Sequence, residues 1–454
     1  MSIKSINPYT NEVLKEYTPY TMDKLEQMLQ LSEKAFKEWR KTSFAKRKEL
    51  MLKCAEVLHS SKQDLGKLIT LEMGKPLKDA ISEIEKCAGC CEYYANNAES
   101  YLKDELVESD ATKSLIAYQP LGTVLAIMPW NFPFWQVFRF AAPSIMAGNI
   151  GMLKHASNVP QCALAIEEVF CKAGFPEGVF QTILIGSDKV DELIGHNVIK
   201  AVTLTGSDAA GAKVAAEAGK HIKKAVMELG GSDPFIVRAD VDIEFVAQKA
   251  VEARFINTGQ SCIAAKRFIV NASIYDKFNK ILVEKAKLMK LGNPLEEGVQ
   301  LGPLARPDLA QSLQEQVNKS VEQGAKVLLD GGVKEKGSAV FYPVILADVK
   351  PGMLAYSEEL FGPAFIVIKA DSDEHAIAIA NDSRYGLGSS IWTKDVAKAE
   401  EMAKEIEAGS VFVNGIVKSD SRLPFGGVKH SGFGRELSTV GIREFVNVKT
   451  IWIK

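Results

Sequence analysis

The chain has 454 residues, of which 25% are charged and 46% hydrophobic. A chain of this length is expected to form more than one hydrophobic core, because a domain usually holds about 100 to 200 residues. The 55 Lys and Arg nearly balance the 57 Asp and Glu, and the net charge of -2 disfavours a nucleic-acid binder held by bulk charge. The N-terminal stretch lacks the apolar core of a signal peptide, and no uncharged apolar run is long enough to span a membrane. We therefore expect a cytosolic protein.

The seven cysteines are an odd number spread over a long chain, which favours reduced thiols over a disulfide framework. Cys87, Cys90 and Cys91 include a C-x2-C spacing that could indicate zinc or redox chemistry. The surrounding stretch has helical periodicity and supplies no second pair of ligands. We therefore predict packed thiols and no metal site.

The predicted elements change character along the chain. Residues 22–94 have apolar side chains at helical spacing and are predicted to form an N-terminal cover of helices. A hairpin is predicted near residues 105–120. From residue 149 to 228, apolar strands alternate with helices, which predicts a parallel, doubly wound sheet. Such a sheet binds its ligand at the carboxyl ends of its strands.

A second alternating series follows the stretch "LGGSDP" at residues 229–234, whose glycines and proline indicate a boundary. It includes the strands "KRFIVN", "FYPVILADV" and "GSVFVNG" and predicts a second α/β domain. No internal repeat is evident.

The loop "TLTGSDAAG" is typical of a phosphate-binding turn. Gly206 and Gly211 bracket a strand-to-helix junction, where free N–H groups at the helix start and the Ser207 hydroxyl can meet a phosphate. The alternative is a plain strand-to-helix turn. Two other strand ends, "PWNFP" and "LKHAS", carry polar groups at the same expected edge, and Lys154 there could contact a ribose or phosphate or be a solvated surface charge.

Cys262, in "NTGQSCIAAKR", lies between polar residues and alanines with no histidine beside it. The thiol of a free cysteine has a pKa of about 8.5, and it becomes a nucleophile where its surroundings favour the thiolate. Glu228, in "MELGG", lies in another glycine-bearing turn, and a carboxylate can act as a general base toward a thiol or a water. For an isolated cysteine and glutamate, packing and surface charge remain the alternative.

The stretches "PWNFP", "LTGSDAAG", "MELGG", "GQSC", "EELFGP" and "LPFGGVKHSGFGRE" together resemble, in order and interval, the NAD(P)-dependent aldehyde dehydrogenase superfamily over the whole chain. The resemblance implies an α/β fold with a Rossmann-like cofactor domain, a catalytic domain and a small β oligomerisation element. The implied ranges are 1–104 and 121–229 for the cofactor domain, 230–438 for the catalytic domain, and 105–120 with 439–454 for the oligomerisation element. Family members are homodimers or homotetramers.

The family chemistry implies roles for three residues. Cys262 resembles the nucleophile that attacks the aldehyde carbon, and Asn131 with the Cys262 backbone N–H resembles the oxyanion hole. Removing one such donor typically costs about 3 kcal/mol of transition-state stabilisation. Hydride transfer to the nicotinamide leaves a thioester, and Glu228 resembles the base that activates water to hydrolyse it. Glu228, through water, and the positive nicotinamide ring are the implied activators of Cys262.

The resemblance also implies a site for NAD or NADP. The residues that match the family's cofactor contacts are Trp130, Lys154, Ser157, Gly206, Ser207, Gly211, Leu229, Glu359 and Phe361. Many NAD-preferring members have a glutamate three residues after the lysine, whereas this chain has Ser157. A hydroxyl leaves room for a 2′-phosphate and removes the repulsion, so we expect NADP to be accepted, with NAD as an open alternative.

The substrate is expected to be a small aldehyde, and the whole pattern is most similar to short succinate-semialdehyde dehydrogenases. Arg139 matches an arginine that holds the distal carboxylate in such enzymes, with a structural arginine as the alternative. A second family arginine is replaced by Ile256, although Arg254 is nearby, and Ser421 and Arg422 lie in the loop before "PFGG". A broad-specificity aldehyde dehydrogenase is the second interpretation. Glu228 disfavours a CoA-acylating enzyme, and the intact chemistry disfavours a binding protein that reuses the fold.

Overall fold

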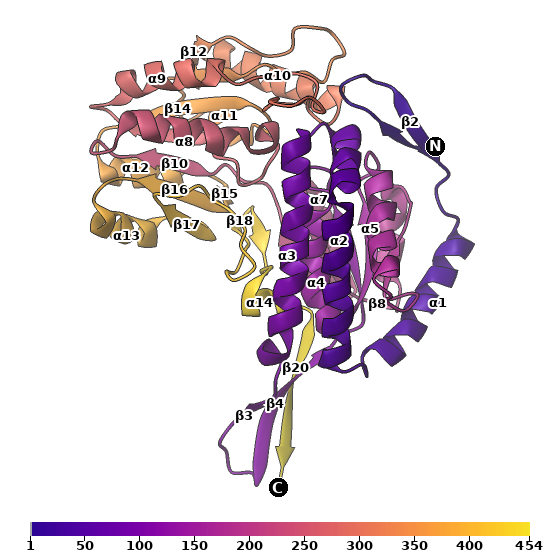
Figure 1. Ribbon diagram of the computed structural model, residues 1–454. Coiled ribbons are helices and arrows are strands. Elements are labelled where there is room, and N and C mark those ends of the chain that lie inside the picture. The colour runs from indigo at the N-terminus through magenta and orange to yellow at the C-terminus, as the bar shows by residue number, and fades with distance from the viewer. Residues whose placement is uncertain (1) are drawn as a thin grey trace.

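The computed structural model describes residues 2–454, which form two lobes and a projecting hairpin (Figure 1). Each lobe is built on a large, mostly parallel sheet covered by helices on both faces. The expected alternation of strands and helices in both halves of the chain is confirmed, and with it the α/β fold class.

The first lobe contains a six-stranded sheet of order β19-β9-β8-β5-β6-β7, in which only β19 is antiparallel. Its strands are β5 (Thr123–Met128), β6 (Ile150–His155), β7 (Phe180–Thr182), β8 (Ile199–Thr205), β9 (Lys224–Glu228) and β19 (Gly432–Phe433). Successive residues of β5 face opposite sides, because side chains alternate along a strand. Val124 and Ala126 pack in one core with α4 and α5, whereas Leu125 packs in another with α1 and α6. Both faces of this sheet are therefore buried, which explains why the sequence of β5 is a continuous apolar run.

The helices of this lobe include two long ones, α2 and α3, which lie side by side across its front in Figure 1. The helices are α1 (Met22–Trp39), α2 (Phe44–Met73), α3 (Leu77–Tyr101), α4 (Trp135–Met146), α5 (Pro160–Lys172), α6 (Val190–Gly195) and α7 (Asp208–Lys220). Helix α2 begins after Ser43, whose side chain accepts a hydrogen bond from the Lys46 N–H, and it ends at Gly74 with a φ of 80°. Cys87, Cys90 and Cys91 lie on α3 as buried packing residues, as predicted.

The second lobe contains a seven-stranded sheet of order β12-β13-β14-β11-β10-β16-β17, in which only β12 is antiparallel. Its strands are β10 (Pro234–Val237), β11 (Arg267–Asn271), β12 (Lys326–Leu329), β13 (Val344–Ala347), β14 (Ala364–Ala370), β16 (Gly388–Trp392) and β17 (Ser410–Val413). Its helices are α8 (Ile243–Phe255), α9 (Tyr275–Lys287), α10 (Pro307–Glu322), α11 (Leu354–Ser357), α12 (Asp373–Asn381) and α13 (Val396–Glu405). Ile269 and Phe268 of β11 belong to different cores, so this sheet is also buried on both faces.

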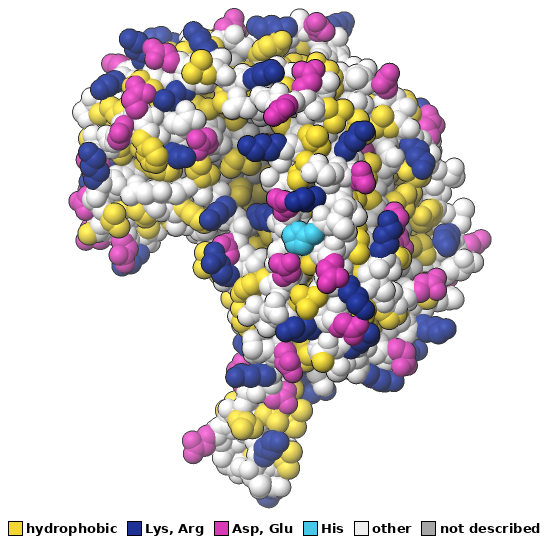
Figure 2. All heavy atoms as spheres, viewed as in Figure 1, with side chains coloured by type: hydrophobic (Ala, Val, Ile, Leu, Met, Phe, Trp, Pro, Cys, Tyr) yellow, Lys and Arg dark blue, Asp and Glu magenta, His cyan; other side chains and the backbone are white. Residues whose placement is uncertain are grey.

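A three-stranded antiparallel sheet projects from the first lobe and carries the C-terminus at its tip (Figure 1). It consists of β3 (Glu105–Leu106), β4 (Lys113–Pro120) and β20 (Val446–Ile453), which follows the short helix α14 (Ser438–Ile442). Leu106, Val448 and Trp452 are 75%, 58% and 48% exposed. The apolar side chains on this projection are visible in Figure 2. Two small antiparallel two-stranded sheets complete the structure, β1 (Ile3–Ile6) with β2 (Val13–Tyr17) and β15 (Tyr385–Gly386) with β18 (Val428–Lys429).

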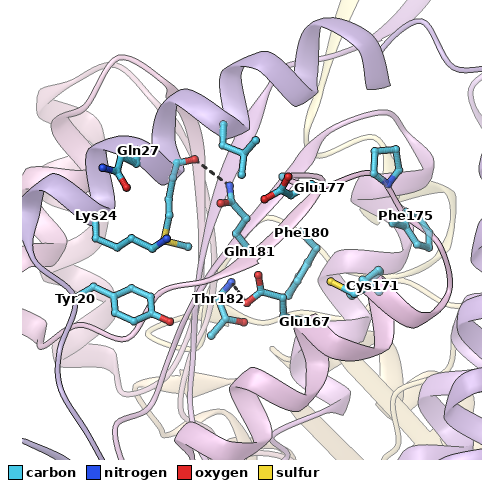
Figure 3. A pocket seen from close by; sticks show the side chains of 15 residues that line it. Tyr20, Lys24, Gln27, Glu167, Cys171, Phe175, Glu177, Phe180, Gln181 and Thr182 are labelled. Atoms are coloured by element: carbon cyan, nitrogen blue, oxygen red, sulfur yellow. Dashed lines mark hydrogen bonds between the residues drawn. The ribbon is translucent and has the colours of Figure 1, made fainter.

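A cavity of about 360 Å³ lies at the edge strand β7, between α1 and α5 (Figure 3). There the Gln181 amide donates to the Met28 carbonyl, and the Thr182 N–H donates to Glu167. These contacts hold the edge of the sheet against its covering helices. The one thiol in this cavity, Cys171, has a pKa raised by burial and by neighbouring carboxylates, which makes it a poor nucleophile.

The predicted division of the chain into ranges stays a prediction, although β19, from within the range 230–438, pairs with β9 of the first lobe. Within residues 2–454, none of the helices combines the length and the apolar character needed to cross a bilayer.

Candidate active site

A cavity of about 270 Å³ lies at the carboxyl ends of β5 and β8, between the two lobes. Figure 2 shows that the surface is hollowed where the lobes meet. The cavity brings together eight of the predicted site residues, Trp130, Asn131, Gly206, Ser207, Leu229, Cys262, Glu359 and Phe361. The other predicted residues lie outside its lining, although Glu228 precedes the lining residue Leu229 and Arg139 donates a hydrogen bond to the lining residue Thr205.

The nucleophile loop is shaped by an abrupt turn after α8. Asn257, Thr258 and Gly259 all have positive φ values, of 53°, 57° and 78°. A β-branched residue such as Thr258 rarely adopts this conformation, and such strain persists only where the surroundings fix it. A Cβ on Gly259 would lie 2.3 Å from the Gly362 carbonyl oxygen, so only glycine fits there. The turn reverses the chain and delivers Cys262 to the cavity just before β11.

The Cys262 thiol is half-buried in the wall of the cavity. Burial raises its pKa to about 12, while the positive charges of Arg139 and Lys266 act in the opposite direction. The thiol therefore rests protonated, and cations in its surroundings determine how easily the thiolate forms.

Asn131 is fixed by a network of amide contacts. Its Nδ2 donates to the Gln260 carbonyl at 3.0 Å, and the Gln136 Nε2 donates to its Oδ1 at 3.0 Å. The Asn257 amide donates to the Asn131 carbonyl at 2.7 Å. An amide nitrogen carries two hydrogens, so one remains for an oxyanion in the cavity.

Glu228 ends β9 and has 2% of its surface exposed. Across the described chain neither of its carboxyl oxygens has a hydrogen-bond partner. Burial, followed by the nearby Glu436 carboxylate, raises its pKa well above the usual range. A Cβ on Gly426 would lie 2.6 Å from Glu228 Oε1, so that glycine leaves room for the carboxyl group. A carboxyl group with a raised pKa and open lone pairs is suited to accept a proton from water.

Arg139, predicted as the substrate anchor, is 3% exposed and forms an ion pair with Glu436. It also donates to the hydroxyl of Thr205, which lines the cavity, at 3.3 Å. Arg422 is exposed and pairs with Asp420 at 2.6 Å, and Ser421 is half-buried near Cys90. Arg254 is fully buried and donates to carbonyl groups of the nucleophile loop and of the "EELFGP" turn, so its contacts are structural. The role of Arg139 toward a substrate stays a prediction.

Six of the residues predicted to bind the cofactor line this cavity, namely Trp130, Gly206, Ser207, Leu229, Glu359 and Phe361. The rings of Trp130 and Phe361 meet edge to face, with centroids 5.8 Å apart. Glu359 Oε1 accepts the Gly231 N–H at 3.2 Å, and a Cβ on Gly230 would lie 2.5 Å from Glu359 Oε2. Ser207 caps α7 by accepting the Ala210 N–H at 3.3 Å. This cradle of a carboxylate, aromatic rings and a helix start fits a dinucleotide.

Gly211 contributes to this site through packing, because a Cβ there would lie 2.5 Å from the Leu229 side chain. It lets α7 approach the turn after β9.

Lys154 and Ser157 lie at the carboxyl end of β6, which is the edge of the sheet where the sequence predicted them. Burial lowers the pKa of Lys154, and the ion pairs found within residues 2–454 do not include it. Ser157 is exposed. An unpaired ammonium and an exposed hydroxyl three residues apart at one strand end fit a phosphate ester. In the same described residues, no cluster of three or more His, Cys, Asp or Glu could hold a metal ion.

Several residues of the site escaped the sequence analysis. Gln136 donates to Asn131, and Lys266 donates to the Cys262 carbonyl in the nucleophile loop. Glu436 pairs with Arg139, and its charge acts on Glu228. Lys86 of α3 donates to Ser419 Oγ at 2.8 Å and lies 4.1 Å from the Trp135 ring centroid. Lys86 is an exposed residue, and partial desolvation of its ammonium group, then the charge of Arg139, lowers its pKa. Lys86 of α3 and Arg139 of α4 are thus two cations on neighbouring helices.

A thiol and an amide donor share one cavity with a dinucleotide cradle at the carboxyl edge of a doubly wound sheet, which defines an NAD(P)-dependent oxidoreductase. The chain belongs to the aldehyde dehydrogenase family, whose family model it matches over residues 1–451. A probable NADP(+) succinate-semialdehyde dehydrogenase of Synechocystis sp. is 49% identical over 453 residues, covering 100% of both chains. The NAD(P)+ succinate semialdehyde dehydrogenase Sad of Escherichia coli is 46% identical, over 99% of this chain and 97% of Sad. The crystal structure of succinic semialdehyde dehydrogenase from Streptococcus pyogenes in complex with NADP+ has a TM-score of 0.97 and 36% identity, covering 99% of each chain.

Proposed function

We propose that this aldehyde dehydrogenase oxidises succinate semialdehyde to succinate and accepts NADP+. The observation that carries the proposal is the pair of cations on the neighbouring helices α3 and α4, Lys86 and Arg139, of which Arg139 donates to the cavity-lining Thr205. The proposal is supported by two relatives named for this substrate, which are 49% and 46% identical to this chain over 100% and 99% of its length. A broad-specificity aldehyde dehydrogenase is the second candidate, because Arg139 is already paired with Glu436.

In the proposed reaction, the Cys262 thiolate attacks the aldehyde carbon, and Asn131 Nδ2 with the Cys262 N–H stabilises the oxyanion. The cofactor, when bound, supplies a nicotinamide ring that accepts a hydride from the substrate carbon. Glu228 then takes a proton from a water molecule, which attacks the acyl carbon and releases the acid and the thiol. Trp130, Glu359 and Phe361 would hold the nicotinamide half of the cofactor.

We propose that Lys86 and Arg139 together recognise the distal carboxylate of the substrate. An anion is attracted to two neighbouring cations, and Trp135 and Ser419 hold Lys86 in place. At the other end of the site, Lys154 and Ser157 would hold the 2′-phosphate of NADP.

The three-stranded sheet of β3, β4 and β20 would join subunits into a homodimer or homotetramer. Its exposed apolar side chains, among them Leu106 and Trp452, support this role. In this proposal the ranges 1–104 with 121–229 and 230–438 are the cofactor and catalytic domains. The seven free thiols support a reducing, cytosolic location.

The substrate proposal is tested by initial rates of NADPH formation with succinate semialdehyde and with butanal. We expect the semialdehyde to be strongly preferred, and Lys86→Met to lower its kcat/KM about tenfold while leaving butanal unchanged. Lys62→Met is a matched control, because Lys62 lies on α2 and pairs with Glu85 on the outer surface of α3. Equal rates with both aldehydes in the native protein would favour the broad-specificity enzyme.

A further inference from the structure

Lys266 is a buried lysine, with 1% of its side chain exposed, in the segment that joins Cys262 to β11. Its ammonium donates to the Ser261 carbonyl at 3.0 Å and to the Cys262 carbonyl at 2.8 Å. It also lies 3.1 Å from Glu359 Oε1. A buried ammonium is costly unless all its hydrogens are used, and these three acceptors satisfy it.

The three contacts connect the two halves of the site. Two of them fix consecutive carbonyl groups of the nucleophile loop, and so determine where the Cys262 N–H and side chain point. The third holds Glu359, whose other contact is the Gly231 N–H at 3.2 Å. A movement of the Glu359 carboxylate would therefore shift Lys266, and Lys266 would shift the backbone of Cys262.

The charges around Cys262 give Lys266 a second effect. The charged groups that act on the thiol are Arg139 and Lys266, which favour the thiolate, and Glu359 and Asp233, which oppose it. Both cations are paired, Arg139 with Glu436 and Lys266 with Glu359, but only Lys266 lies in the segment of the nucleophile itself and also binds its carbonyl groups.

We infer that Lys266 is a positioning residue that fixes the nucleophile loop, favours the thiolate of Cys262 and links it to Glu359. The inference rests on the proposed function, in which Cys262 is the nucleophile. It does not depend on which aldehyde is oxidised.

The test measures alkylation of Cys262 in the full-length protein by neutral iodoacetamide and by anionic iodoacetate, read peptide by peptide by mass spectrometry. In Lys266→Met we expect the iodoacetamide rate to fall about tenfold, because fewer thiolates form. We expect the iodoacetate rate to fall about threefold further, because a positive charge near the sulfur is lost. Glu359→Gln should raise the ratio of the iodoacetate to the iodoacetamide rate.

An unchanged iodoacetamide rate, or an unchanged ratio of the two rates, would overturn the inference, since a merely structural lysine would slow both reagents alike. Lys266→Gln repeats the test if the methionine variant does not fold. Lys223→Met is the matched control, because Lys223 also donates to two carbonyl groups, those of Ile194 and His196, away from the site. Exposed Cys171 is the internal standard. Failure of the native protein to reduce NADP+ with any aldehyde would reject the proposed function, whereas the alkylation ratio reports on Lys266 alone.

Discussion

Arg139 of α4 and Glu436 form an ion pair in which both side chains are almost fully buried, at 3% and 4% exposure. The pair lies behind the cavity wall, where Arg139 also contacts Thr205. Removing one member of a buried pair leaves an uncompensated charge. In the proposed function Arg139 also contacts the substrate carboxylate, so a change to this pair is expected to affect both stability and substrate recognition.

Arg139→Met should lower the free energy of unfolding by about 3 to 5 kcal/mol, because Glu436 is left buried without its cation. The double variant Arg139→Met with Glu436→Gln should recover part of that loss. Urea denaturation of the three proteins measures both effects. If Arg139→Met changed only KM for the semialdehyde and not the unfolding free energy, the ion pair would be incidental.

Gln136 should act through Asn131. Gln136→Met removes the donor to Asn131 Oδ1 and should lower kcat about tenfold, because a misaligned oxyanion donor loses part of its effect. In an Asn131→Ala background the same change should have little further effect on kcat. Additive losses in the double variant would show that Gln136 acts independently of Asn131.

Glu228 should control hydrolysis of the acyl enzyme. Glu228→Gln should release about one equivalent of NADPH per active site in a rapid burst and then turn over slowly. Because the pKa of Glu228 is raised, the base form is present only above that pKa, and hydrolysis should be lost as the pH falls through it. Glu436→Gln removes a carboxylate that raises this pKa and should shift the acid limb of kcat to lower pH. A shift to higher pH would contradict the assignment.

Ser157 should decide between the cofactors. Ser157→Glu places a carboxylate where the 2′-phosphate is expected and should lower kcat/KM for NADP+ roughly 100-fold, since the repulsion of two nearby charges is worth a few kcal/mol. The value for NAD+ should change little. Ser157→Ala serves as the control for loss of the hydroxyl without added charge.

The sequence predicted the alternating α/β elements well, because strands such as β5 and β8 are short apolar runs bounded by turn residues. The family resemblance implied that Asn131 and Cys262 share one site, and both line the same cavity. It could not predict the partner of Arg139, because Glu436 is far along the chain and α4 is buried on all sides, so periodicity marks no particular face. Gln136 could not be recognised for the same reason, because it lies on α4, which is buried on all sides. Lys266 could not be recognised for a different reason. A lysine is almost always a surface residue, and only the folded loop shows the carbonyl groups that it satisfies.

The most direct test of the account is the initial rate of NADPH formation from succinate semialdehyde and NADP+ by the native protein and by Cys262→Ser, with Cys171→Ser as the control thiol. We expect rapid reduction by the native protein and by Cys171→Ser, and a loss of about a thousandfold or more in Cys262→Ser. Full activity in Cys262→Ser would contradict the assignment of Cys262 as the nucleophile.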